Sequence, residues 1–319
     1  MSLGEFELIA RLLRPLASGF PGALELGDDA ALVEVPSDRQ LVVAKDAIVE
    51  GVHFLPDDPP ELVAGKLLRV NLSDLAAMGA DPLAYLTVIA RPPHLEDRWL
   101  EDFARGLADD QARFGLHLIG GDTVATPGPL LLSLTVLGLV PRGAALLRSG
   151  ARPGELVCVS GTLGDAAMGL RILRGLAVPE ELVPPLVERY RTPRPRLALG
   201  RALRGLASAA IDVSDGLLAD LGHVLERSSV GAEIELARLP LSEAARGLPG
   251  ARSCALSGGD DYELLFTLPQ QHEGLLPELA TRAGVPIAVI GRTTTEPGLR
   301  VLDPEGRPMT IERTGWRHF

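Results

Sequence analysis

The spacing of apolar residues along the chain predicts helices and strands in both halves. Helices are expected where side chains able to pack on one face recur every three or four positions, as over Leu62, Lys66, Leu67, Val70 and Leu75. Strands are expected where leucine and β-branched residues run together, as in Leu132–Val136. In the first half the pattern predicts helices over 4–17, 59–78 and 95–114, and strands over 31–35, 40–49, 83–90, 116–119 and 130–140. In the second half it predicts helices over 163–175, 181–190, 195–208, 216–228 and 271–283, and strands over 155–160, 232–236, 262–268 and 286–290.

A cluster of glycine and proline residues near the middle of the chain predicts a domain boundary. The cluster comprises Pro141, Gly143, Gly150, Pro153 and Gly154. The length of 319 residues suits two domains of roughly 150 residues each. We therefore expect one domain over 1–141 and another over 150–319. Both mix strands with helices, so the fold class is α/β or α+β, and a continuous sheet across both halves remains compatible with the pattern.

Composition and charge limit the environment and the partners. The chain is 46% hydrophobic and 23% charged, which is typical of a folded globular protein. Its net charge of −11 disfavours nucleic acids and anionic membrane surfaces as partners. The longest nearly apolar run, Leu130–Val140, is too short to span a bilayer. Glu5, Glu7 and Arg11 interrupt the apolar pattern at the N-terminus, which favours an amphipathic helix over a signal peptide. We expect a cytoplasmic protein.

Cysteine and lysine are both scarce, and each shortage disfavours particular kinds of site. Cys158 and Cys254 stand alone in apolar stretches, which favours buried structural thiols over a disulfide framework or a zinc site. Lys45 and Lys66 are the only lysines, whereas P-loop and protein-kinase sites need a lysine at the phosphates. The phosphate-binding motif Gly-x-x-x-x-Gly-Lys-Ser/Thr, the dinucleotide-binding motif and the Gly-x-Ser-x-Gly elbow are also absent. Any nucleotide phosphates would therefore have to be neutralised mainly by metal ions.

Aspartates recur in apolar or glycine-rich surroundings, where an ionised carboxylate is costly unless it is paired or binds a cation. They lie in Gly27-Asp28-Asp29, Lys45-Asp46-Ala47, Ser73-Asp74-Leu75, Gly120-Gly121-Asp122, Asp212-Val213-Ser214-Asp215-Gly216 and Gly258-Gly259-Asp260-Asp261. Magnesium prefers carboxylate and water oxygens and shares them with substrate phosphates. Adjacent glycines let backbone N–H groups approach phosphate oxygens. The set as a whole predicts a shared acidic metal site.

Each of these residues, taken alone, also has a simpler interpretation. Asp74, Asp212 or Asp215 could each cap a helix N-terminus, and Gly-Asp-Asp or Gly-Gly-Asp is a common turn sequence. His53 could be a satisfied surface or core histidine. Trp316 would usually be a packing residue, and Arg148, in Arg148-Ser149-Gly150-Ala151, would usually be solvated.

The ordered series of segments resembles the thiamine-monophosphate kinase family, within the superfamily of ATP-binding enzymes that includes aminoimidazole ribonucleotide synthetase. The resemblance runs essentially from end to end, and the long block Asn71–Ala80 is its most specific part. The other matching segments are Gly4-Glu5-Phe6, Gly27-Asp28-Asp29, His53-Phe54-Leu55-Pro56, Gly120-Gly121-Asp122-Thr123, Arg148-Ser149-Gly150-Ala151, Asp212-Val213-Ser214-Asp215-Gly216-Leu217 and Leu256-Ser257-Gly258-Gly259-Asp260-Asp261-Tyr262-Glu263-Leu264.

The resemblance implies both a fold and an activity. The fold is an N-terminal α/β domain, which binds ATP and metal and whose sheet pairs across a homodimer, followed by a C-terminal α+β domain, with active sites near the dimer interface. The activity is ATP-dependent phosphorylation of thiamine monophosphate to thiamine diphosphate, by direct in-line transfer of the ATP γ-phosphate with the help of several Mg²⁺ ions.

The resemblance also implies roles for individual residues. It implies Mg²⁺ ligands at Asp29, Asp46, Asp74, Asp122, Asp212 and Asp215, of which Asp46, Asp74 and Asp212 are expected to be catalytic. It implies ATP contacts at Gly121, Asp122, Arg148 and Ser214, and contacts to thiamine monophosphate at His53, Asp260 and Trp316. Two positions depart from the family pattern. Ala44 and Lys45 stand where the family often has hydroxyl residues, and Asp260 stands where it often has glutamate.

The sequence is also compatible with other functions. Another enzyme of the same superfamily, such as a selenophosphate or aminoimidazole ribonucleotide synthetase, is the nearest alternative. No cysteine precedes Cys158, which disfavours the selenophosphate enzyme, because that enzyme would be expected to carry a reactive cysteine or selenocysteine near its N-terminus. A non-catalytic sensor of thiamine diphosphate or ATP is the alternative from another class, and it would not need so many aspartates.

Overall fold

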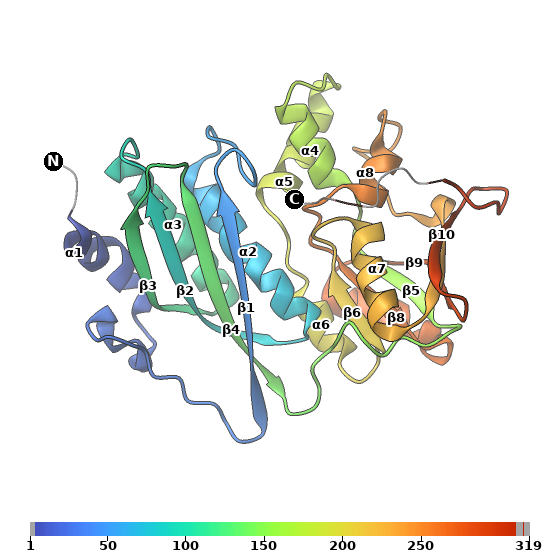
Figure 1. Cartoon of the computed structure of the whole chain (residues 1–319), viewed down its shortest axis with the longest axis horizontal. Coiled ribbons are helices and arrows are strands. Elements are labelled where there is room, and N and C mark those ends of the chain that lie inside the picture. Colours follow the sequence, from blue (N-terminus) through green and yellow to red (C-terminus); the bar gives the residue numbers. More distant parts are fainter. Residues whose placement is uncertain (1–3, 311–314, 316–319) are drawn as a thin grey trace. The chain divides into compact units, whose positions relative to one another are not determined.

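The computed structural model describes residues 4–310 and Gly315, and the chain divides into two compact units (Figure 1). The N-terminal unit comprises residues up to 75 together with 80–143. The C-terminal unit comprises 76–79 together with the residues from 144 onward. Each unit has its own sheet, and both contain helices, so the predicted mixed class is confirmed.

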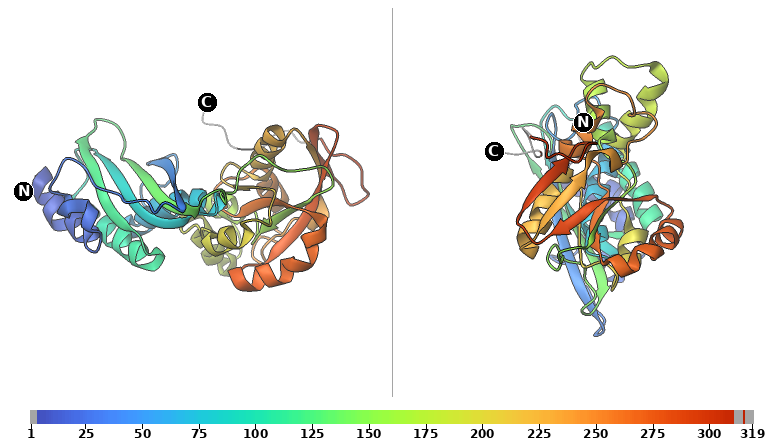
Figure 2. Two further views of the ribbon diagram at one scale, coloured as in Figure 1. Left: turned by 90° about the horizontal axis from the view of Figure 1, so that it is seen from below. Right: turned by 90° about the vertical axis from the view of Figure 1, so that its right-hand side faces the viewer.

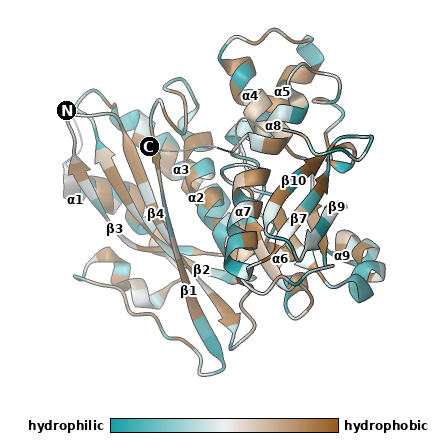
Figure 3. Ribbon diagram, turned by 45° about the vertical axis from the view of Figure 1, so that its right-hand side comes forward, coloured by the Kyte–Doolittle hydropathy of each residue, from teal (hydrophilic) through white to brown (hydrophobic). Residues whose placement is uncertain are grey.

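The N-terminal unit is built on a four-stranded sheet in the order β1-β4-β2-β3. The strands are β1 Arg39–Val49, β2 Asp81–Arg91, β3 His117–Ala125 and β4 Leu131–Pro141. Strand β4 runs antiparallel to β1 and β2, whereas β2 and β3 are parallel. Figure 3 shows apolar residues running along these strands. The chain begins with short helical segments at α1 Glu5–Leu8, η1 Ile9–Leu13, η2 Arg14–Ala17 and η3 Pro21–Leu26.

Helices α2 (Pro60–Ala77) and α3 (Asp97–Phe114) lie on the same face of this sheet (Figure 2). They pack closely at Gly106, where a Cβ atom would come within 2.5 Å of the carbonyl oxygen of Glu61. A buried ion pair also joins them, with Arg69 Nε 2.6 Å from Asp110 Oδ2. Because both partners are present and bidentate, the cost of burying these charges is offset. Helix α2 is thereby held rigidly, and it carries Asp74.

The C-terminal unit is built on a six-stranded sheet in the order β10-β7-β9-β5-β8-β6. The strands are β5 Leu156–Ser160, β6 Ala209–Asp212, β7 Gly231–Glu235, β8 Leu264–Leu268, β9 Ile287–Thr294 and β10 Gly298–Leu302. The helices are α4 Asp165–Leu173, α5 Val183–Arg191, α6 Leu197–Leu203, α7 Leu217–Ser228, α8 Ala251–Ser257 and α9 Leu276–Ala283, with short 3-10 helices at η4 Glu180–Leu182, η5 Leu236–Arg238 and η6 Gln270–Leu275. All pairings are antiparallel except the parallel pair β7 and β10.

The core of this unit fixes the end of β6. Val157 and Ile211 on the sheet pack in one buried cluster with Leu217 and Leu221 of α7. This places the turn between β6 and α7 on a rigid support. Both cysteines are also buried and free, as predicted, and burial is the main cause that raises the pKa of Cys158 to about 12.

Some predicted elements differ from the structure. Residues 31–35 form no strand, and the predicted strand over 116–119 is the first part of the longer β3. The predicted helix over 195–208 ends at Leu203. Strands β6 and β10 and helix α8 were not predicted. Within the described residues, no helix is both long and apolar enough to cross a membrane.

Candidate active site

A cavity of about 410 Å³ in the N-terminal unit brings three of the predicted residues together. Asp29 lines it from the segment that follows η3, and Gly121 and Asp122 line it from β3. Asp28 lines it too. All four residues are exposed to solvent, so their carboxylates and the adjacent glycine backbone are accessible to a ligand. Oxygen donors beside a glycine suit a hard divalent cation and a phosphate group.

Gly121 cannot be replaced here without moving the backbone. In the parallel pairing of β2 with β3, Gly121 lies opposite Thr87. A Cβ atom on Gly121 would lie 2.1 Å from the carbonyl oxygen of Thr87. The glycine therefore lets β3 approach β2 closely just before Asp122, and it leaves the cavity wall free of a side chain at this point.

A hydrogen-bonded link connects the elements that carry Asp46 and Asp74. The backbone N–H of Asp46 on β1 donates to Oδ1 of the buried Asn71 at 3.0 Å, and Asn71 lies one helical turn before Asp74 on α2. The Ser133 hydroxyl donates to the carbonyl oxygen of Asp46 at 3.0 Å. The ammonium group of Lys45 donates to the same hydroxyl at 2.8 Å. The backbone of Asp46 is thus fixed from both neighbouring elements, and β1 holds a set position beside α2.

His53 follows β1 in a turn that fixes its ring. Its Nδ1 accepts the backbone N–H of Val49 at 3.1 Å, so in the neutral ring Nε2 carries the proton. The carbonyl oxygen of His53 accepts a hydrogen bond from Nζ of Lys66 at 2.9 Å. The side chain is only partly buried. In this tautomer Nε2 is a hydrogen-bond donor, which is the kind of group that can bind a phosphate oxygen.

In the C-terminal unit, the turn between β6 and α7 carries three predicted residues. Asp212 ends β6 and is buried, whereas Ser214 and Asp215 are half-buried. A further carboxylate, Asp220, lies in the first turn of α7, and its Oδ2 accepts the backbone N–H groups of Asp215 at 3.1 Å and Gly216 at 3.0 Å.

The electrostatics of this turn suit a cation. Burial, followed by the negative charges of Asp212 and Asp215, raises the pKa of Asp220 to about 7. The negative charges of Asp212 and Asp215 therefore act on Asp220, and a divalent cation at this turn would relieve that repulsion. Sequence reasoning missed Asp220. The available signal was an acid in the first turn of a helix that follows a glycine.

Asp260 lies directly against this turn. Its backbone N–H donates to the carbonyl oxygen of Ser214 at 2.9 Å, and the N–H of Tyr262 donates to that of Val213 at 2.8 Å. Both Asp260 and Tyr262 have positive φ angles, of 70° and 50°. The left-handed region costs a non-glycine residue roughly 1–2 kcal/mol, so neighbouring contacts must hold this loop in place.

Two of the predicted residues are not brought into these sets. Arg148 is exposed, and its carbonyl oxygen accepts a hydrogen bond from Ser228. Trp316 lies outside the described residues. Among residues 4–310 and Gly315, no group of three or more histidine, cysteine or acidic side chains is arranged closely enough to hold a metal ion. The predicted metal ligands instead divide into Asp29, Asp46, Asp74 and Asp122 in the N-terminal unit and Asp212 and Asp215 in the C-terminal unit.

Comparison with known proteins places the chain in a family. Residues 27–140 match the family described as AIR synthase related protein, N-terminal domain, and residues 152–303 match AIR synthase related protein, C-terminal domain. The thiamine-monophosphate kinase of Escherichia coli is 45% identical over 325 aligned positions, which cover 100% of this chain and 99% of the relative. The chain belongs to the thiamine-monophosphate kinase family.

Solved structures agree with this family. The thiamine-monophosphate kinase of Stenotrophomonas maltophilia is 43% identical, with a TM-score of 0.86 and coverage of 97% of this chain and 99% of the other. A structure described as AaThiL complexed with AMPPCP and TMP is 33% identical, with a TM-score of 0.79 and coverage of 100% and 99%. The thiamine-monophosphate kinase fold therefore extends over both units of this chain.

Proposed function

We propose that this chain is an ATP-dependent kinase that phosphorylates thiamine monophosphate to thiamine diphosphate. The observation that carries the proposal is the match to thiamine-monophosphate kinases over the whole chain. The segments with the predicted aspartates all fall within that match, and a related structure is described as a complex with AMPPCP and TMP. No step of this reaction requires a residue type that the chain lacks.

The chemical obstacle is repulsion between two anions rather than weakness of the nucleophile. The acceptor is a phosphate monoester that is already ionised near neutral pH, so the reaction needs no general base. Two unit charges ~4 Å apart repel by about 4 kcal/mol at an effective dielectric near 20, and ATP and the acceptor form several such pairs. Catalysis then consists mainly of neutralising charge and aligning the two phosphates for in-line transfer.

We assign the neutralisation to carboxylate-bound Mg²⁺, held by Asp29, Asp46, Asp74, Asp122, Asp212 and Asp215. When bound, Mg²⁺ supplies Lewis acidity and positive charge at the phosphate oxygens. The donor chemistry fits this ion, because the side chains are hard oxygen donors and because burial, together with Asp212 and Asp215, raises the pKa of the neighbouring Asp220. Asp46, Asp74 and Asp212 are the residues on which we expect turnover to depend most.

The two substrates are assigned to different groups of residues. Gly121, Asp122, Arg148 and Ser214 bind ATP, with backbone N–H groups and the Arg148 guanidinium facing the phosphates. His53 and Asp260 bind thiamine monophosphate. The Nε2 proton of His53 suits the phosphate, and the Asp260 carboxylate suits the cationic thiamine. Trp316, assigned from sequence, would stack on the thiamine rings, a cation–π contact worth ~1–2 kcal/mol when desolvated.

We further propose that the protein is a homodimer formed through the N-terminal sheet, with the domains extending over 1–141 and 150–319. Support comes from the edge strand β1, whose Leu41 and Val43 are exposed. These residues alternate along β1 with the less exposed Val42 and Ala44, so they lie on the more open face of the strand. An apolar strand face left open to water is typical of a protein interface. We place the enzyme in the cytoplasm, where ATP is available.

The function is tested by measuring ATP turnover with thiamine monophosphate, with thiamine, and with no acceptor, at saturating Mg²⁺. The proposal requires ADP and thiamine diphosphate to form in equal amounts with thiamine monophosphate alone. Turnover with thiamine, or ADP release without an acceptor, would instead indicate another enzyme of the superfamily. Binding of thiamine diphosphate or ATP without turnover would indicate a sensor.

A further inference from the structure

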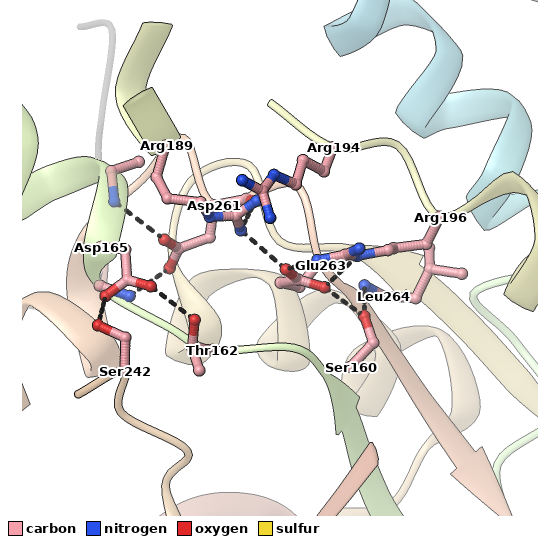
Figure 4. Close-up of polar contacts among 12 residues, drawn as sticks. Ser160, Thr162, Asp165, Arg189, Arg194, Arg196, Ser242, Asp261, Glu263 and Leu264 are labelled. Atoms are coloured by element: carbon pink, nitrogen blue, oxygen red, sulfur yellow. Dashed lines mark hydrogen bonds and ion pairs between the residues drawn. The ribbon is translucent and has the colours of Figure 1, made fainter. Parts of the chain in front are cut away.

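Two buried carboxyl groups follow Asp260 in the loop that faces the turn between β6 and α7. Asp261 is 1% exposed, and Glu263 is fully buried at 0%. Figure 4 shows the Glu263 carboxylate bonded to arginines and to the Ser160 hydroxyl, and the Asp261 carboxylate bonded to backbone N–H groups. Burying a carboxyl group is costly unless hydrogen bonds or opposite charges compensate it, so the contacts of these two groups need to be accounted for.

The Glu263 carboxylate accepts four hydrogen bonds, three from arginines and one from a serine hydroxyl. Arg196 donates to both of its oxygens, from Nε at 2.6 Å and from Nη2 at 2.5 Å. Arg189 Nη2 donates at 2.8 Å, and the Ser160 hydroxyl donates at 2.6 Å. Gly161 makes room for the carboxylate, because a Cβ atom there would lie 2.2 Å from Oε1. A carboxylate fixed by two guanidinium groups has very little rotational freedom.

Arg189 also contacts the backbone of Asp261, two residues before Glu263. Arg189 Nη2 donates to the backbone carbonyl oxygen of Asp261 at 3.2 Å. The side chain of Asp261 accepts the backbone N–H of Gly164 at 2.7 Å. The backbone is therefore fixed on both sides of Tyr262, by Asp261 before it and by Glu263 after it.

This clamp acts on the part of the loop that is strained. The carbonyl oxygen of Glu263 accepts the N–H of Val213 at 2.8 Å, which continues the pairing made by Tyr262 and Asp260 with Val213 and Ser214. The positive φ angles of Asp260 and Tyr262 persist only if their surroundings hold them. The Glu263 clamp is the most deeply buried set of polar contacts adjoining these two residues.

We propose that Glu263 is a positioning residue. It fixes Asp260, and the turn between β6 and α7 that Asp260 contacts, in the conformation that receives the thiamine substrate. The proposal rests on the assigned role of Asp260 in binding thiamine monophosphate. Glu263 touches neither substrate. It acts through the backbone of the loop, and Arg189 and Arg196 act with it by holding its carboxylate.

The test compares Glu263→Gln with a matched control, Glu188→Gln. Glu188 pairs with Arg194 at 2.7 Å, both side chains are about half exposed, and the pair lines the same cavity of about 650 Å³ as Arg189 and Arg196. Glu263→Gln is expected to raise the KM for thiamine monophosphate between about tenfold and a hundredfold, and to raise the KM for ATP by a smaller factor, because Ser214 in the neighbouring turn is assigned to ATP. Glu188→Gln should change neither. A loss of folded enzyme alone would lower kcat and leave both KM values as they were, and that result overturns the proposal.

A double-mutant cycle with Asp260→Ala separates action through Asp260 from a general effect. If Glu263 acts through Asp260, Glu263→Gln has little further effect on the KM in the Asp260→Ala background. Full additivity of the two changes contradicts the proposal. If Glu263→Gln fails to fold, Arg196→Lys takes its place, because it keeps the charge, removes the two-pronged contact and lies at the less buried edge of the clamp.

Hydrogen exchange provides a measurement that does not depend on the substrate. Peptides over 258–264 should exchange faster in Glu263→Gln than in the wild type, because the N–H groups of Asp260 and Tyr262 lose their fixed acceptors. Glu188→Gln should match the wild type, and equal exchange in all three proteins would refute the clamp. If the wild type does not phosphorylate thiamine monophosphate, the proposed function fails, while this measurement still decides whether Glu263 holds the loop.

Discussion

Oδ2 of Asp220 accepts the backbone N–H of Asp215 at 3.1 Å, so a buried carboxylate in the first turn of α7 holds the backbone of a predicted Mg²⁺ ligand. The same oxygen also accepts the backbone N–H of Gly216 at 3.0 Å. An asparagine at position 220 could keep both bonds through its amide oxygen, whereas an alanine could keep neither.

We therefore expect Asp220→Ala to raise the Mg²⁺ concentration needed for half-maximal activity by roughly tenfold or more, as is typical when a group supporting a metal ligand is removed. Asp220→Asn should lie closer to the wild type, because it preserves the acceptor. Magnesium titrations of initial rate would check this. If both variants shift the Mg²⁺ dependence equally, the hydrogen bonds to the turn are not the cause.

Replacement of single predicted ligands should remove activity and leave the fold intact. Asp74→Asn and Asp212→Asn are nearly isosteric changes that delete one negative charge. We expect kcat to fall by at least about a hundredfold, a size typical of losing one electrostatic contact to the transition state. Asp109→Asn, on the exposed side of α3, is the matched control. Near wild-type turnover of either ligand variant at saturating Mg²⁺ would remove that residue from the site.

Gly121 provides a steric test of the N-terminal cavity. Because an added Cβ would meet the Thr87 carbonyl oxygen at 2.1 Å, Gly121→Ala should cost about 1–3 kcal/mol of unfolding free energy and weaken ATP binding. Gly128→Ala is the control, because its nearest contact would be an ordinary 3.5 Å to the Thr126 hydroxyl. Urea unfolding and ATP titration would measure both effects, and equal behaviour of the two variants would contradict the assignment.

The pH dependence of stability should reveal the buried Asp261. Burial raises the pKa of Asp261 well above its usual 3.8, so the folded protein binds this proton more tightly than the unfolded chain does. Stability from this group is complete below about pH 4 and is lost as pH rises through the folded pKa. Relative to Asp261→Asn, the wild type should therefore become less stable as pH rises above about 4, as urea unfolding at several pH values would show.

Asp303 provides a control, because its pKa is shifted in the opposite direction to that of Asp261. Hydrogen bonds from the backbone N–H of Arg307 and from neighbouring groups lower the pKa of Asp303. Its contribution is present above its unfolded pKa and is lost as pH falls, so the wild type should gain stability relative to Asp303→Asn as pH rises from about 3 to 5. If the two pairs of proteins show the same slope, the effect of Asp261 does not come from its own ionisation.

The proposed dimer predicts that a charge on the open face of β1 prevents assembly. Val43 is 58% exposed, so Val43→Glu should leave the fold of the N-terminal unit intact and shift the protein toward monomer. Leu275→Glu, at an exposed leucine of the C-terminal unit, is the control. Light scattering after size-exclusion chromatography gives the mass directly. A wild-type protein that is monomeric at micromolar concentration would contradict the proposed interface.

Most long elements could be predicted from periodicity alone, because their apolar spacing is regular. Helix α2 and strand β4 differ from the predicted 59–78 and 130–140 by one residue at each end. The missed strand β6 is short and begins with two alanines, and alanine has little preference for strands. It becomes a strand because β8 pairs with it, a long-range contact that no local pattern contains.

The candidate site was predictable only in part, for a similar reason. Glycine-rich segments marked Asp29, Gly121 and Asp122, and the structure places all three around one cavity. Asp220 and Glu263 had no such marker. Asp220 looked like an ordinary first-turn acid, and Glu263 lay within the matching segment Leu256–Leu264 without a role assigned to it. What distinguishes them is burial and contact with residues distant in sequence, such as Ser160 for Glu263.

The two lysines differ in how far a reagent can reach them. Lys66 is 2% exposed, with its ammonium group bonded to the carbonyl oxygen of His53, whereas Lys45 lies on the open face of β1. An amine-reactive dye should therefore modify the folded protein at Lys45 and spare Lys66. The signal of a dye attached at Lys45 would then report whether a second subunit covers β1, without any engineered labelling position.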